Sequence, residues 1–209
     1  MIPRQVRAAF YVPFAAAVAA ALAACTSAAA TPSATPVPTP QATSEATASP
    51  SQTPAASLPP GAPGWLSMEL TDVTTGEKFT IGGLGANAVL VQNMAQWCPT
   101  CRSQAGEVKK VAEAFGEEGG LSIVSLDVDP NEDAASLKAY AAKEGFGWRF
   151  AVAPADLLRE IDDLYGTQYL NPPSAPMLLV KADGSVLPLS TGIKSAEKLQ
   201  ETIIGFLGL

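Results

Sequence analysis

Two cysteines separated by two residues are the part of this sequence whose types and spacing point most directly to chemistry. They stand in the run Trp97-Cys98-Pro99-Thr100-Cys101. This spacing lets both sulfurs meet within one helical turn, so the pair can alternate between a dithiol and a disulfide. Such a pair predicts thiol–disulfide exchange.

The local sequence around the pair indicates which sulfur reacts first. The pair follows an apolar run at 88–91 and opens a stretch with helical periodicity. Pro99 stands where a first helical residue is expected, a position that suits proline because no N–H bond is lost there. Unpaired N–H groups and the helix dipole at such a start favour a negative sulfur, so we expect Cys98 to be the thiolate. Thr100 can donate a hydroxyl hydrogen bond to it.

The expected reaction has two exchange steps. The Cys98 thiolate attacks a disulfide of a partner, and Cys101 then resolves the mixed disulfide; oxidation runs the same steps backward. Three other interpretations of the pair stay open. It could be a structural disulfide, it could bind copper(I) between the two sulfurs, or it could belong to a non-catalytic domain that only binds partners. A structural bond closing so short a loop gains little entropy.

Composition excludes several other classes of function. The 209 residues contain no histidine, which removes the commonest general base and the commonest neutral metal ligand. A Ser-His-Asp hydrolase is therefore excluded, and we expect no metal and no cofactor beyond the redox-active disulfide. The formal net charge is −7 at pH 7 and no basic patch is present, which argues against nucleic acid as a partner.

The third cysteine, Cys25, closes a predicted lipoprotein signal peptide over residues 1–24. Arg4 and Arg7 supply a positive end, and an uncharged, mostly apolar run follows at 8–24. The ending Leu22-Ala23-Ala24-Cys25 resembles a bacterial lipobox, in which the cysteine becomes lipidated. An uncleaved single-span anchor and an ordinary cleaved signal are the alternatives. We expect the chain on the extracytoplasmic face of the cell membrane, held there by lipid on Cys25.

The next segment, residues 25–62, is predicted to be a spacer. It consists almost entirely of Ala, Ser, Thr and Pro, and Glu45 carries its only charge. Such a composition cannot bury enough apolar surface to order itself. The spacer would let a membrane-tethered domain reach its partners.

Residues 63–209 have the pattern of one α/β domain. Apolar runs typical of strands alternate with helical faces, which predicts a mainly parallel sheet covered on both sides. A closing hairpin at Asp183-Gly184 makes the sheet mixed. The expected elements are a hairpin at 68–81, strands at 88–91, 121–126, 177–180 and 186–189, and helices after Cys98, at 137–141, at 157–165 and after the cap Ser195.

The strand, the Trp-Cys-Pro-x-Cys helix start and the later Ala175-Pro176 strand entry together resemble thioredoxin-like proteins. Closest are the exported TlpA/ResA/DsbE-type thiol–disulfide oxidoreductases, many of them membrane-anchored. The resemblance covers about residues 66–208. It implies a thioredoxin-like fold: a central mixed β-sheet flanked by helices, with an extra strand–helix insertion near 148–165.

The resemblance also implies roles for two residues far from the cysteines. In such proteins the proline before the late strand is cis and lies against the disulfide, and the residue before it pairs its backbone with the substrate. Here these are Pro176 and Ala175. Pro172 and Pro173 are rivals for the position, and a trans loop proline is the alternative.

Several positions depart from the family pattern. Gln92 stands where thioredoxins carry a buried Asp, and Gln104 where some reductases carry a Glu. Neither amide titrates, so neither can move a proton. We expect Gln92 and Trp97 to support the site without acid–base work.

The expected partners are thiols or disulfides of exported proteins and a membrane redox partner. Cys-Pro-Thr-Cys and Lys181-Ala182-Asp183-Gly184 are similar to actinobacterial DsbE/DsbF-type oxidases. TlpA/ResA-type proteins instead keep cytochrome or other thiols reduced. The direction depends on the reduction potential, and the sequence leaves both directions open.

Overall fold

The structure is a computed structural model that describes residues 58–115 and 120–209. The predicted signal peptide, Cys25 and most of the predicted spacer lie outside these residues. Within the described ranges, no helix combines the length and the apolar character needed to cross a membrane.

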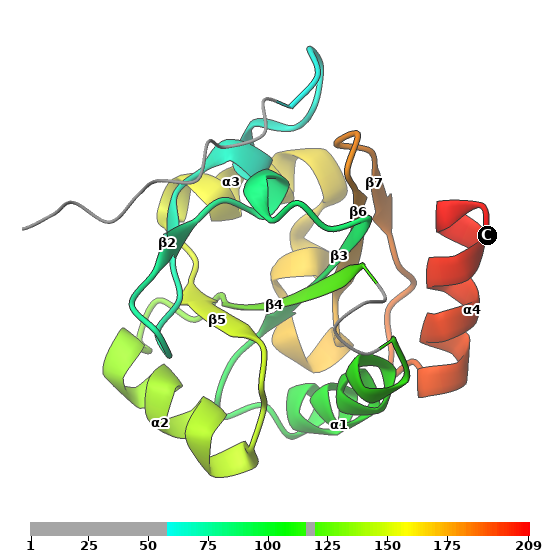
Figure 1. The fold of residues 1–209 in the computed structure, drawn as a ribbon. Helices are drawn as coiled ribbons and strands as arrows, with labels where there is room; N and C mark the ends of the chain where they lie inside the picture. Colours follow the sequence, from blue (N-terminus) through cyan, green and yellow to red (C-terminus); the bar gives the residue numbers. More distant parts are fainter. Residues whose placement is uncertain (1–57, 116–119) are drawn as a thin grey trace, which may run out of the picture. The chain divides into compact units, whose positions relative to one another are not determined.

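A five-stranded mixed sheet forms the centre of the domain, as predicted (Figure 1). Its order is β5-β4-β3-β6-β7, with β3, β4 and β5 parallel and β6 and β7 antiparallel to their neighbours. The strands are β3 (Ala88–Met94), β4 (Leu121–Asp127), β5 (Arg149–Val152), β6 (Met177–Lys181) and β7 (Val186–Pro188).

Helices cover both faces of this sheet because β3, in its centre, is apolar on both sides. Ala88 and Leu90 pack toward α1 and α4, whereas Val89 and Val91 pack toward α3. Side chains alternate between the faces of a strand, so a strand buried on both faces reads as a continuous apolar run. The helices are α1 (Pro99–Phe115), α2 (Ala134–Glu144), α3 (Ala155–Tyr165) and α4 (Ala196–Leu207).

The smaller predicted elements are also present. The opening hairpin forms a separate two-stranded sheet of β1 (Leu70–Thr71) and β2 (Lys78–Phe79). The predicted strand–helix insertion is β5 followed by α3, and Ser195 caps α4 by accepting a hydrogen bond from the Lys198 backbone. The short 3-10 helices are η1 (Gly64–Ser67), η2 (Ile81–Gly83), η4 (Thr167–Leu170) and η5 (Pro172–Ser174).

The packed domain reaches back to Leu58. Leu58 and Ala62, which the sequence predicts as the end of the spacer, both pack against the core. Two glycines leave room for them: a Cβ added at Gly82 would lie 2.7 Å from Leu58 Cδ1, and one at Gly184 would lie 2.7 Å from Ala62 Cβ. Gly184 also has φ +78°, a conformation that suits glycine. These residues therefore belong to the folded unit.

A buried carboxyl group ends strand β4. Asp127 is only 1% exposed, and the Glu132 carboxyl lies beside it. Burial raises the pKa of Asp127 to about 7, and a hydrogen bond with Glu132 acts in the same direction. The Asp129 backbone N–H, 3.1 Å from Asp127 Oδ1, opposes them by favouring the charged form. The carboxyl thus holds a proton at pH values where an exposed aspartate is ionised.

This raised pKa predicts how stability varies with pH. The folded chain binds a proton at Asp127 below about pH 7, whereas the unfolded chain releases it above about pH 4, so stability falls between these values. Asp127→Asn cannot ionise. We expect its free energy of unfolding, relative to wild type, to rise by about 2 kcal/mol from pH 5 to pH 8 in urea titrations. Asp163→Asn, at an exposed position of α3, is the matched control and should follow wild type. Parallel curves for Asp127→Asn and wild type would contradict the assignment.

Candidate disulfide site

The cysteine pair lies at the junction of β3 and α1, where the sequence places it. The backbone N–H of Cys98 donates to the Ala95 carbonyl at 3.1 Å, which closes the turn after the strand. The N–H of Arg102 donates to the Cys98 carbonyl at 3.2 Å, so Cys98 accepts the first bond of the helix. Helix α1 begins at Pro99, as predicted. Cys98 therefore occupies the N-terminal cap of α1.

Cys98 and Cys101 form a disulfide, with their Cα atoms 5.3 Å apart. Both residues are about 1% exposed. They lie in an apolar cluster at the carboxyl end of the sheet, whose other buried members are Met94, Ala95, Leu137, Tyr140, Ala141 and Phe150. The reactive sulfurs are thus held in place by packing as well as by the backbone.

The Cys98 sulfur receives a hydrogen bond from the backbone. The N–H of Cys101 points at Cys98 Sγ across 3.0 Å. The predicted bond from the Thr100 hydroxyl is not among the hydrogen bonds of the described part of the chain, and the Cys101 N–H takes that role. A backbone donor at a helix start stabilises a negative sulfur. When the disulfide opens, this geometry favours the thiolate at Cys98.

The Cys101 sulfur faces an acceptor instead of a donor. Its Sγ lies 3.2 Å from the carbonyl oxygen of Pro172, in η5. In the dithiol form a Cys101 thiol can donate its proton to this oxygen, which favours the neutral form. The two sulfurs therefore have different surroundings: Cys98 is suited to attack a disulfide, and Cys101 is suited to keep its proton until the second step.

The side-chain amides of Gln92 and Gln104 form hydrogen bonds with backbone groups. Gln92 is buried, and its Nε2 donates to the Cys101 carbonyl at 3.0 Å, while its Oε1 has no partner among the described residues. Gln104, one turn after Cys101, bonds to both backbone groups of Lys194. Both side chains hold the start of α1 in place, and neither offers a titrating group.

Acidic residues from the loop between β4 and α2 anchor the segment before Cys98. Trp97 is 56% exposed, and its indole Nε1 donates to Asp129 Oδ2 at 2.6 Å. Hydrogen bonds from the Asn131 backbone and from Trp97 lower the pKa of Asp129. The Gln96 backbone N–H donates to the Glu132 carboxylate at 2.8 Å. Sequence reasoning missed Asp129 and Glu132, although acids at the carboxyl end of a strand beside β3 were a visible signal.

The prediction of a cis bond before Pro176 is wrong, because the described residues contain no cis peptide bond. Ala175 makes the turn into β6 instead: it ends η5 with φ 46° and ψ 55°, the left-handed region. Pro176 still lies beside β3, where its carbonyl accepts from the Asn93 N–H at 3.2 Å. Pro172 contacts the disulfide through its carbonyl oxygen, which lies 3.2 Å from Cys101 Sγ.

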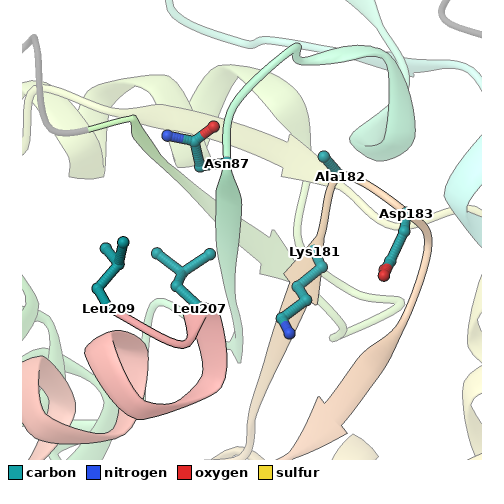
Figure 2. Close-up of a pocket in the computed structure, with 6 residues that line it drawn as sticks. All are labelled: Asn87, Lys181, Ala182, Asp183, Leu207 and Leu209. Atoms are coloured by element: carbon teal, nitrogen blue, oxygen red, sulfur yellow. The ribbon is translucent and has the colours of Figure 1, made fainter.

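A separate hollow of about 420 Å³ lies at the opposite end of the sheet (Figure 2). Lys181 pairs with Ala88 at the start of β3, whereas Cys98 follows the end of that strand. The hollow is lined by Asn87, Lys181, Ala182, Asp183, Leu207 and Leu209. It takes no part in the disulfide site.

Within the described ranges, no three His, Cys, Asp or Glu side chains gather as metal ligands do.

Comparisons with known proteins identify relatives of this chain. The family model described as thioredoxin matches residues 73–140. The thioredoxin of Listeria monocytogenes serovar 1/2a (strain EGD-e) is 30% identical over 135 residues, which cover 65% of this chain and 93% of that protein.

Solved structures share the fold. A secreted disulfide oxidoreductase of Mycobacterium tuberculosis homologous to E. coli DsbE superposes with a TM-score of 0.53 at 16% identity, covering 67% of this chain and 96% of its own. A thiol:disulfide interchange protein of the thioredoxin family from Chlorobium tepidum TLS superposes with a TM-score of 0.53 at 21% identity, covering 68% and 93%. With a Cys-x-x-Cys disulfide at the start of α1, this chain belongs to the thioredoxin family and is a thioredoxin-like thiol–disulfide oxidoreductase.

Proposed function

We propose that this protein exchanges disulfides with exported polypeptides on the extracytoplasmic face of the cell membrane, held there by lipid on Cys25. The observation that carries the exchange chemistry is the Cys101 N–H directed at Cys98 Sγ, which prepares one sulfur of the pair for attack. The location is supported by the lipobox-like ending at Cys25. The description of the Mycobacterium tuberculosis neighbour as secreted is in keeping with it.

The proposed cycle follows from the two sulfur environments. The Cys98 thiolate attacks one sulfur of the partner's disulfide, and the other partner sulfur leaves as a thiolate. Cys101 then gives up its proton and attacks Cys98 Sγ, which re-forms the disulfide and releases the partner as a dithiol. Gln92 and Gln104 do not titrate, so the Cys101 proton passes to water or to the departing partner thiolate.

An exposed aromatic side chain next to the disulfide suits a polypeptide partner. Trp97 is 56% exposed and directly precedes Cys98. Tryptophan is enriched in the contact surfaces between proteins. Its position supports a protein substrate over a small thiol.

The reduction potential decides the direction of the exchange. A potential near that of thioredoxin, about −270 mV, would make the pair a reductant, whereas one near that of DsbA, about −120 mV, would make it an oxidant of exported proteins. Equilibration with glutathione followed by acid trapping and separation of the two forms measures it.

We expect Cys101→Ser to trap the partner, because Cys98 still attacks but nothing resolves the mixed disulfide. The trapped species should appear as a higher band on a non-reducing gel and should disappear when dithiothreitol is added. Cys98→Ser keeps Cys101 and is the matched control, in which no adduct should form. An adduct that forms equally in both variants would contradict the assigned roles, and no adduct in either would contradict the exchange itself.

Lipidation at Cys25 predicts a covalent lipid label. Full-length wild type expressed in a bacterium fed radiolabelled palmitate should carry the label, and Cys25→Ala should not. Thr26→Ala, one residue further, is the control and should be labelled as wild type is. An unlabelled wild type would contradict lipidation and favour an uncleaved span or an ordinary cleaved signal instead.

A further inference from the structure

A buried lysine lies next to the segment that contacts the disulfide. Lys194 is 7% exposed, and its ammonium donates to three backbone carbonyls: Ala175 at 2.9 Å, Ser190 at 2.8 Å and Gly192 at 2.5 Å. Among the described residues no ion pair includes Lys194. An ammonium has three N–H donors, so all three are used. The charge is thus held by carbonyl oxygens alone.

The charged form suits this environment better than a neutral amine. A neutral amine has two donors and one lone pair, so one of the three carbonyls would face the lone pair. Burial opposes the charge and lowers the pKa of Lys194 to about 8. The lysine therefore has a cost of burial that the three hydrogen bonds must offset.

The backbone of Lys194 is tied to the helix that carries the cysteines. Its N–H donates to Gln104 Oε1 at 2.7 Å, and its carbonyl accepts from Gln104 Nε2 at 3.0 Å. The loop before it is tied to the segment after Pro172, because the Gly192 N–H donates to the Ser174 carbonyl at 2.8 Å. Lys194 thus links α1 to η5 and to Ala175, the residue that ends η5.

The residue that receives the Lys194 bond has a rare conformation. Ala175 is the one non-glycine residue with positive φ among the described residues. An alanine in the left-handed region is strained, and such strain persists only where neighbouring groups enforce it. Two bonds do so here: the Ala175 N–H donates to the Pro172 carbonyl, and the Ala175 carbonyl accepts from Lys194.

This enforced turn places the Pro172 carbonyl against Cys101 Sγ. We propose that Lys194 is a positioning residue for the redox pair: by holding Ala175 in its turn, it keeps the Pro172 carbonyl where the Cys101 thiol donates to it, and so stabilises the dithiol. This inference rests on the proposed disulfide exchange and assigns a residue that sets its equilibrium.

The redox equilibrium between this protein and glutathione measures the effect of Lys194. Protein dithiol and glutathione disulfide give protein disulfide and two glutathione thiols, so two electrons and two protons pass from the cysteines to glutathione. Lys194→Met removes the three bonds but keeps an unbranched apolar stem. Losing one hydrogen bond to the dithiol should raise the equilibrium constant for oxidation about fivefold. That change corresponds to a potential about 20 mV more negative.

Two matched variants separate positioning from general damage. Lys194→Arg keeps the charge and N–H donors, although on a larger planar group, and it should shift the equilibrium less than Lys194→Met. Lys198→Met removes an exposed lysine of α4 and should change nothing. Should Lys194→Met fail to fold, as judged by circular dichroism, Lys194→Gln takes its place in the same comparison.

The possible results are distinct. A folded Lys194→Met whose equilibrium constant matches wild type overturns the inference, and so does an Arg variant that shifts as far as the Met variant. In both cases wild-type exchange still stands. A wild-type pair that never equilibrates with glutathione overturns the proposed function itself, together with this inference.

Discussion

The hydrogen bond from the Cys101 N–H to Cys98 Sγ depends on where α1 begins, and the rest of the site depends on that bond. A helix start presents backbone N–H groups that no residue inside the helix can satisfy. Placing Cys98 at the cap directs one of these donors at a sulfur. The helix must therefore begin directly after a buried strand. The apolar β3 provides that strand, and Pro99 begins the helix.

The carboxyl end of the sheet gathers the other parts of the site. Loops after β3 and β4 meet there, so Trp97 and Asp129 come together although they are 32 residues apart. The segment before β6 reaches the same end from the opposite direction, because β6 runs antiparallel to β3. Open α/β sheets commonly place their sites at this end. The unequal surroundings of the two sulfurs arise from this meeting of separate loops.

The sequence predicts the local features well and the long-range ones poorly. Apolar periodicity predicts the strand before Cys98 and the mixed sheet, and one proline predicts the start of the helix at Pro99. Each of these signals lies within a few neighbouring residues. The bond between Gln104 and Lys194 joins residues 90 apart, and no spacing rule reveals it. The resemblance predicts a cis bond before Pro176, yet the turn is made by the left-handed φ of Ala175. A left-handed alanine leaves no mark in the sequence, since glycine is the usual occupant of such a conformation.

The docking of Leu58 and Ala62 beside Gly184 determines where the chain enters the domain. Gly184 lies in the turn between β6 and β7, next to the Lys181 end of β6, which pairs with the start of β3. Cys98 follows the other end of β3. The chain therefore enters the domain at the end of the sheet remote from the sulfurs. The entry point and the disulfide lie at opposite ends of the same strand, so the segment that enters the domain leaves the reactive end unobstructed.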